Sequence, residues 1–507
     1  GFVAGGQSNH FGEGGCSEAP SETQEPTQYP TDHPSELMTL VIPYPTYPPS
    51  ELGSQGEPGC TPFVDDGAIS CASEAEFDFK LGFPREGFGD TDNKMFGSSV
   101  TFVGEGGRTI AVGSGVPDSA VHIYQKPGNP YLDDYYLWEY LTSIEMTNVE
   151  TSTVLFGASL DSNDEGYIVV GAPSLSGNVA SGMAFVYEPN SNWTNWDLVA
   201  TLTSSGDDEG GIPATSASFG SNVAFEGALI AVGSSGERNG KGSVYIFEKT
   251  GNAWTEEVKL SPTDVADGAR FGSSVSLHGE TPATLAVGAP GDDGGGSAFV
   301  YTRSDFNWLP RRLTSDEEEG DGFGSHVVVS GCTVAVSSPK DSTSSMNGKG
   351  TIRIFNWDVD SDDWVQSQII KPGDELFGNV FGECIAMEGN TLLAGSPGGG
   401  EGGEQSGVIY HFERSGGQVS LDKCKIACVS HSVYISGLLF SKSYLCVIQW
   451  VKLSVIPNSF YAPGDEDSFG CPLSVSGDSA VAGSRLDSAN GLRSGSVLIY
   501  DLCPVIG

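Results

Sequence analysis

Short apolar runs separated by turn residues dominate the chain, and residues 269–301 show this pattern most clearly. FGSSVSL, TLAVGAP and SAFVY are three apolar runs, and turns rich in Gly, Pro and Asp separate them. Runs of five to seven residues, β-branched or aromatic and bounded by such turns, are typical of β-strands. No stretch of ten or more residues shows convincing helical periodicity. The pattern therefore predicts an all-β protein.

The same pattern recurs along most of the chain. An FG dipeptide opens each copy, at Phe96, Phe156, Phe219, Phe271, Phe323, Phe381 and Phe469. Each copy continues with a second run such as AVGAP (286–290) and a third run that ends in an aromatic residue such as Tyr301. A fourth run opens with Trp and often closes on an aliphatic residue six positions later, as in Trp254 to Leu260. Seven copies of a four-strand unit predict a seven-bladed β-propeller.

The quoted motifs FGSSV, AVGAP and GSAFVY resemble the FG-GAP repeat, which occurs in the propeller of integrin alpha subunits. The resemblance covers about residues 75–502. It implies a seven-bladed propeller, usually extracellular, with binding surfaces on the loops of one face. The FG and Gly-Ala residues are expected to pack between blades and to do no chemistry.

The seventh copy ends at 495–503 and lacks a fourth run, so another part of the chain must complete it. Residues 75–81 precede the first FG and resemble the segments before other copies, which predicts them as the outer strand of the last blade. This divides the chain into an N-terminal arm (1–73) and a propeller (74–507). Cys71 and Cys503 would meet at this closure, and we predict a disulfide between them.

Other cysteines have less context. Cys16 and Cys60 are expected to pair within the arm, whereas Cys332, Cys384 and Cys471 lie on predicted strands and are interpreted as free buried thiols. Cysteines near the termini favour an oxidising compartment.

The arm differs in composition from the propeller, since it holds ten of the 28 Pro residues. Such segments are typically extended. One interpretation is a disordered or glycosylated tether; the other is an arm that docks on its own propeller or on a neighbouring molecule. The residues that would dock are apolar or aromatic: Leu40, Val41, Ile42, Tyr44 and Tyr47.

Residues 419–449 form an atypical insertion with three Cys, one Gly and one acidic residue. Removing them shortens the last FG spacing from 88 to 57 residues and brings Trp450 to the start of a fourth run that closes at Ile456. We therefore put forward a retained intron in this segment. The alternative is a genuine apolar loop that binds a partner.

The net charge of the chain limits the classes of partner that it can bind. The chain of 507 residues has 66 acidic and 24 basic residues, for a net charge of −42. Such acidity argues against nucleic-acid binding and is typical of a soluble secreted protein. No apolar run reaches the ~18 residues of a membrane span. The first residue is Gly1 rather than Met, which would fit removal of a signal peptide.

Candidate chemistry is sparse. Carboxylates in the turn between the first two strands of a blade can bind Ca²⁺, but here only Asp161, Asn163 and Glu165 keep a trace of that pattern. No cofactor is required. Acidic loops before several FG motifs are predicted to lie on one rim, either as a solvated surface or as a site for calcium or a basic partner. Asn192 opens the chain's only N-glycosylation sequon. The Ser-His pair at 325–326 lies on a repeat strand and is interpreted as structural.

The sequence thus predicts a secreted or cell-surface, non-enzymatic interaction or structural protein that binds protein or glycan partners. Rim loops and the arm would make the contacts, and the arm could also mediate self-assembly. The alternatives are a lectin-like propeller, with shallow aromatic pockets between blades, and an enzyme with its site in the central channel. The fold alone does not decide among them.

Overall fold

A computed structural model describes most of the propeller. The described residues are 63–65, 68–70, 76–82, 95–115, 119–126, 138–146, 154–174, 182–205, 218–279, 282–304, 307–315, 321–341, 350–372, 380–397, 407–415, 449–457, 469–485 and 495–502. All of these residues belong to one compact unit, residues 60–507. The predicted arm residues Leu40, Val41, Ile42, Tyr44 and Tyr47 lie outside the described residues, as do Cys16 and Cys60.

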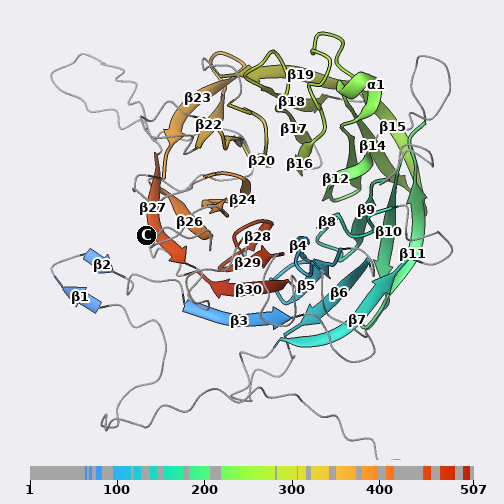
Figure 1. Ribbon diagram of the computed structural model, residues 1–507, viewed down its shortest axis with the longest axis vertical. Helices are drawn as coiled ribbons and strands as arrows, with labels where there is room; N and C mark the ends of the chain where they lie inside the picture. Colours follow the sequence, from blue (N-terminus) through green and yellow to red (C-terminus); the bar gives the residue numbers. More distant parts are fainter. Residues whose placement is uncertain are drawn as a thin grey trace, which may run out of the picture. The chain divides into compact units, whose positions relative to one another are not determined.

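The predicted strand runs form seven antiparallel four-stranded sheets, which are the blades of a propeller (Figure 1). Blade 1 contains β4 (Ser99–Phe102), β5 (Thr109–Gly113), β6 (Ala120–Gln125) and β7 (Glu139–Glu145). Blade 2 contains β8 (Ser159–Ser162), β9 (Ile168–Ala172), β10 (Met183–Pro189) and β11 (Trp196–Leu202). Blade 3 contains β12 (Phe219–Glu226), β13 (Leu229–Ser234), β14 (Ser243–Thr250) and β15 (Ala253–Leu260).

The remaining blades follow the same order. Blade 4 contains β16 (Ser274–His278), β17 (Thr284–Ala289), β18 (Ser297–Ser304) and β19 (Asn307–Thr314). Blade 5 contains β20 (Val327–Ser330), β21 (Thr333–Ser338), β22 (Thr351–Asp358) and β23 (Asp363–Ile370). Blade 6 contains β24 (Cys384–Glu388), β25 (Thr391–Ser396), β26 (Val408–Ser415) and β27 (Gln449–Pro457). Blade 7 contains β28 (Leu473–Ser476), β29 (Ser479–Ser484), β30 (Ser496–Asp501) and β3 (Glu76–Gly82).

Three further elements of the described residues lie outside the blades. The strands β1 (Phe63–Asp65) and β2 (Ala68–Ser70) pair as a hairpin, within the segment that the sequence assigns to the arm. A single turn of helix, α1 (Glu237–Gly240), lies between β13 and β14. None of the helices in the described ranges is long and apolar enough to cross a membrane.

The ring closes by combining the two ends of the chain in blade 7. The strand β3 pairs with β30 in antiparallel register, with Phe77 opposite Tyr500 and Leu81 opposite Val497. In Figure 1 the blue β3 lies beside the red β30. The sequence predicts residues 75–81 for this place. Cys71 and Cys503 lie outside the described residues, so the disulfide between them stays a prediction.

Glycine packing explains why both halves of the repeat motif need Gly. A Cβ on Gly288 of the second strand of blade 4 would overlap the carbonyl oxygen of Gly324, the FG glycine of the next blade. Gly324 itself has a φ of +89°, which disfavours any side chain. The same pairing recurs at five other seams, between Gly113 and Gly157, Gly171 and Gly220, Gly233 and Gly272, Gly395 and Gly470, and Gly483 and Gly97. Close backbone approach at the seam is therefore the common role of the two glycines.

The FG phenylalanines form the centres of the seams. All seven are at most 1% exposed. Phe271 contacts the ring of Tyr301 edge to face, with centroids 6.2 Å apart, while its backbone bridges to Gly242 of the preceding blade. The buried apolar residues accordingly fall into seven clusters, each shared by two neighbouring blades. The FG residues thus build the fold, as their repetition indicates.

The fourth-strand tryptophans hold a constant register against the third strand. Lys249 lies opposite Trp254, and Arg303 opposite Trp308, each two residues after the third-strand aromatic. In most blades a bulge follows, which adds one residue to the outer strand. Blade 4 lacks the bulge, and there Trp308 and Leu313 are five rather than six positions apart. The spacing from the Trp to the aliphatic residue therefore indicates whether the outer strand of a blade contains the bulge.

Trp450 occupies the same register in blade 6, opposite Arg414, and Ile456 lies opposite Ile409. The backbone of blade 6 is therefore completed by the residues that directly follow the atypical insertion. Residues 419–448 lie outside the described residues, and their origin as a retained intron stays a hypothesis.

The interpretation of Cys384 and Cys471 as free thiols is wrong. They form a disulfide with their Cα atoms 5.4 Å apart, joining β24 of blade 6 to the segment that enters blade 7. Cys332, at the turn between β20 and β21, is also disulfide-bonded. The pairing of Cys384 with Cys471 could not be read from the sequence, because 87 residues separate them and only the neighbouring position of two blades brings them together.

Candidate functional site

The loops of the propeller lie on two faces. Because the strands of a blade are antiparallel, the connections from strand two to three and from strand four to the next blade lie on one face, here called the upper rim. The turns between strands one and two lie on the opposite face. In the described residues, the upper rim is most complete at blades 3 and 4, where residues 235–242, 261–271 and 290–296 belong to it.

Exposed carboxylates mark this part of the upper rim. The side chains of Asp264, Asp267 and Asp293 are 70%, 69% and 68% exposed. Asp264 and Asp267 belong to a loop that precedes an FG motif. The acidic loops that the sequence singles out, 206–211, 315–322, 372–375 and 463–468, lie largely outside the described residues. We call Asp264, Asp267 and Asp293 the acidic rim.

A charge pair between a partly exposed Arg and a buried carboxylate holds the acidic rim in place. Arg312 of β19 contacts Asp292 at 2.5 Å and Asp293 at 2.6 Å, and it also lies 3.8 Å from Asp264. The buried Asp292 carboxylate accepts a hydrogen bond from the backbone N–H of Ala266. One Arg therefore ties the loop after β17 to the loop after β15, so two rim loops from neighbouring blades are fixed together.

Related buried charge pairs occur in the blades on either side. Glu237 of blade 3 accepts hydrogen bonds from the Tyr245 hydroxyl and the Lys259 ammonium at 2.7 and 3.1 Å. In blade 5, Asp341 accepts a hydrogen bond from Thr351 and lies 3.6 Å from Arg353. Sequence reasoning missed these pairs, although an acidic residue five positions after the Val of AVGSSGE, AVGAPGD and AVSSPKD was a signal.

The predicted calcium residues lie on the opposite face and are engaged in hydrogen bonds. The Asp161 carboxylate accepts the backbone N–H groups of Ser162 and of Phe225 in blade 3, at 2.9 and 2.8 Å. Asn163 donates to the Gly227 carbonyl, also in blade 3, whereas Glu165 is exposed. Nowhere in the described ranges do three His, Cys, Asp or Glu side chains gather as a metal site. Calcium binding by these residues stays a prediction.

Burial raises the pKa of Asp161 to about 7, more than its two N–H donors and Thr101 lower it, and nearby Glu226 adds to the rise. Burial also lowers the pKa of His122 and of His326 to about 4. Ser325 donates its hydroxyl proton to the Gly322 carbonyl, and the His326 backbone pairs with Ser337. The Ser-His pair thus lies just before β20 and bonds to neighbouring residues of its own blade, and its structural role stays an interpretation.

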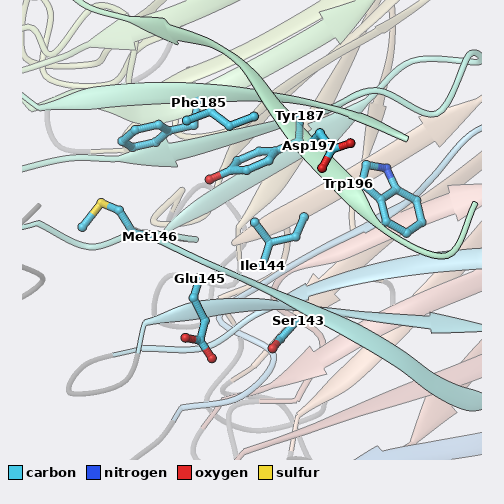
Figure 2. Close-up of a pocket in the computed structure, with 9 residues that line it drawn as sticks. Ser143, Ile144, Glu145, Met146, Phe185, Tyr187, Trp196 and Asp197 are labelled. Carbon is cyan, nitrogen blue, oxygen red and sulfur yellow. The ribbon is translucent and has the colours of Figure 1, made fainter. Parts of the chain in front are cut away.

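A groove of about 320 Å³ lies at the seam between blades 1 and 2 (Figure 2). We call it the seam groove. One side is formed by four consecutive residues, Ser143 to Glu145 at the end of β7 and Met146 directly after it. The other side is formed by residues of β10 and β11. The residues from blade 2 are Phe185, Tyr187, Trp196, Asp197 and Leu198. The residues around the depression therefore include three aromatic residues and two acidic ones, Glu145 and Asp197. Sequence reasoning did not find it.

A comparison with known protein families agrees with the positions of the strands in the blades. The FG-GAP repeat family matches residues 254–301, 364–412 and 463–500. The first two matches begin at the fourth-strand residues Trp254 and Trp364 and end at the third-strand aromatics Tyr301 and Phe412 of the next blade. The repeat and the blade are thus offset by one strand, and β3 has to close the ring. This chain is a seven-bladed β-propeller that contains FG-GAP repeats in three places. No curated protein sequence matches it.

Two solved structures are similar to this FG-GAP propeller at 10% identity. One is Sqt1 from Saccharomyces cerevisiae. The match covers 85% of this chain and 100% of the Sqt1 chain, with a TM-score of 0.40. The other is a putative 6-phosphogluconolactonase from Bacteroides uniformis. The match covers 71% of this chain and 88% of the bacterial chain, with a TM-score of 0.42.

The FG-GAP propeller exposes its glycosylation sequon. Asn192 is exposed in the turn between β10 and β11. Thr194 of the sequon exchanges hydrogen bonds with Asn190, which holds the turn. The site is accessible, and its glycosylation stays a prediction.

Proposed function

We propose that this chain is a secreted or cell-surface interaction protein that binds a protein partner through its upper rim, with the N-terminal arm contributing to binding or self-assembly. The observation that carries the proposal is the acidic rim. Asp264, Asp267 and Asp293 are exposed on two loops that Arg312 joins. The motif residues, in contrast, are buried in the seams and are not available to a partner.

The acidic rim suits a partner with a basic surface. Complementary charge raises association rates and favours one partner over others, and loops that are held in place lose less freedom on binding. The net charge of −42 extends this preference to the whole molecule. A basic protein surface is therefore the chemistry that we expect the rim to select.

Two features support an extracellular location. Cys384, Cys471 and Cys332 are disulfide-bonded, and disulfides persist mainly in oxidising compartments. The exposed Asn192 provides a place for a glycan. An extracellular matrix or a cell surface would thus supply the partner.

A glycan ligand is the second candidate. The rings of Tyr187 and Trp196 line a depression between two blades, which is where a lectin-like propeller would place aromatic residues. An enzymatic site in the central channel has no observation in its favour, and we propose none.

Photo-crosslinking tests the proposed function. The full chain would carry a photoreactive amino acid at Asp293 on the upper rim or, as the matched control, at the exposed Glu105 on the opposite face. We expect a protein partner to be crosslinked from position 293 and not from 105. Equal labelling from both positions, or labelling by glycans alone, would contradict a protein-binding upper rim. A chain that begins at Cys60 would then show whether the arm adds to the yield.

A further inference from the structure

The seam groove runs along the edge of a strand and not across one face. Successive side chains of a strand point to opposite faces, yet four consecutive residues, Ser143 to Met146, line the groove. Figure 2 shows Ile144 directed toward the aromatic rings of blade 2 and Glu145 directed away from them. The feature that these residues share is the outer edge of β7, which the groove therefore follows.

That edge is open to pairing. In blade 1 the strand order is β4-β5-β6-β7, so β6 occupies one edge of β7 and no described strand occupies the other. An unpaired strand edge presents N–H and C=O groups that an incoming strand can bind. Peptide recognition by strand addition takes its affinity from such main-chain bonds and its specificity from neighbouring pockets.

Apolar and aromatic residues surround the neighbouring pocket, with most of their own surface buried. Phe185, Tyr187 and Trp196 form its blade 2 side, with Ile144 and Met146 opposite. Leu198, at the rim of the groove, is 49% exposed. The Tyr187 hydroxyl donates to no acceptor within the described residues, although its ring is almost fully buried. The pocket thus offers a surface for an apolar side chain and one hydroxyl for a polar atom.

Charge in the seam groove selects a cation. Glu145 and Asp197 are both exposed and line the groove. Neither forms an ion pair with any Lys or Arg of the described chain. A Lys or Arg side chain could lay its aliphatic stem along the apolar wall and bring its charge to Asp197. Glu145 points away from that wall, so it would meet a cation on the opposite face of an added strand.

We infer that the seam groove binds an extended segment of a protein partner in which apolar residues alternate with Lys or Arg. The segment adds as a fifth strand to the free edge of β7, places an apolar side chain against Tyr187 and Trp196, and presents its cations to Glu145 and Asp197. This inference rests on the proposed function, because it assigns one attachment point to a protein partner.

The test uses the full chain and a fluorescein-labelled octapeptide of alternating Val and Lys, titrated by fluorescence anisotropy at physiological ionic strength. Two comparison peptides carry Glu in place of Lys, or N-methyl groups on alternate residues that block strand pairing. The charge-reversal variants E145K and D197K are compared with E139K, which changes an exposed residue of the same strand outside the groove. Thermal melts would confirm that all three variants are folded.

We expect E145K and D197K each to weaken binding of the Val-Lys peptide about fivefold or more, because an attraction becomes a repulsion, with little change for E139K. The N-methylated and Glu-containing peptides should bind much more weakly. Equal binding by the three variants, or undiminished binding of the N-methylated peptide, would overturn the inference. Selective binding of chitohexaose that D197K abolishes, in the absence of peptide binding, would overturn it in favour of a glycan.

The two proposals fail separately. Crosslinking of a protein partner from position 293, combined with equal peptide binding by the three variants, would leave the proposed function intact and remove the seam groove. A groove that binds the peptide in a chain that crosslinks no partner from the upper rim would do the reverse.

Discussion

Gly288 and Gly324 touch across the seam between blades 4 and 5, so closely that a Cβ on Gly288 would overlap the Gly324 carbonyl oxygen. At the next seam the second-strand glycine is replaced by Ser337. A Cβ added to Gly382, the facing FG glycine, would lie 3.1 Å from the Ser337 Cβ. The two seams therefore make the same contact with different tolerance for a side chain.

This difference predicts the effect of exchanging the two residues. We expect Gly288→Ser to lower the free energy of unfolding by about 1–3 kcal/mol, because the added atoms must push apart two backbones. The matched exchange Ser337→Gly should cost much less. Urea unfolding followed by tryptophan fluorescence measures both. Equal effects would show that the glycine contact does not set the seam.

Truncation tests how the ring is closed. A chain that begins at Cys60 keeps β3 and should unfold at nearly the same temperature as the full chain. A chain that begins after Gly82 loses the strand that pairs with β30, so an apolar edge is exposed. We expect this second chain to aggregate or to melt at a much lower temperature. Similar melting of the two truncated chains would show that β3 is dispensable.

Two buried groups should make the stability depend on pH in opposite senses. The pKa of His122 is lowered by burial to about 4 from 6.5, so its contribution is present above pH 6.5 and is lost as the pH falls toward 4. The pKa of Asp161 is raised by burial to about 7 from 3.8, so its contribution is present below pH 3.8 and is lost as the pH rises through 7.

Single variants separate the two contributions. Between pH 7.5 and pH 4.5, His122→Gln should remove about 2.5 kcal/mol of acid-induced loss, as expected for a buried His with this shift. Asp161→Asn should remove a gain on acidification and make the chain more sensitive to acid. The free energy of unfolding across this pH range decides the matter. A change of the same sign in both variants would be inconsistent with the burial of these groups.

Mass spectrometry tests the atypical insertion. If residues 419–449 are a retained intron, digestion of the native protein should yield a peptide that joins Gln418 directly to Trp450, because that junction keeps the register of blade 6. Digestion without reduction would also identify the partner of Cys332. A peptide from within 421–448, or a disulfide from Cys332 to that segment, would show that the insertion is genuine protein.

Most of the fold could be predicted from the sequence because each repeat is a local pattern. The FG dipeptide, the Gly of the second run and the Trp of the fourth follow one another in the same order, and each makes the same contact in nearly every blade. The five-residue spacing from Trp308 to Leu313 accompanies the missing bulge of blade 4, which only the structure revealed. Repetition thus converts weak strand signals into a reliable architecture.

The functional features were harder to predict because they depend on residues that meet only after folding. Asp292 is an ordinary acidic turn residue in the sequence. Only the folded structure brings Arg312 close enough to form an ion pair with its buried carboxylate. The seam groove combines one blade's outer edge with the aromatic residues of the next, which no local pattern records. Cys384 and Cys471 are likewise distant in sequence and adjacent only across a seam.

The affinity of the crosslinked partner for rim variants tests the central claim most directly. Asp264, Asp267 and Asp293 would be replaced together by Asn, and Glu105 and Asp478 on the opposite face by Gln and Asn as the control. We predict that the rim variant binds the purified partner at least about tenfold more weakly, whereas the control binds normally. The loss should lie in a slower association rate, and added salt should reduce the difference in rate between the variant and the original chain. Unchanged affinity of the rim variant would contradict recognition through the acidic rim.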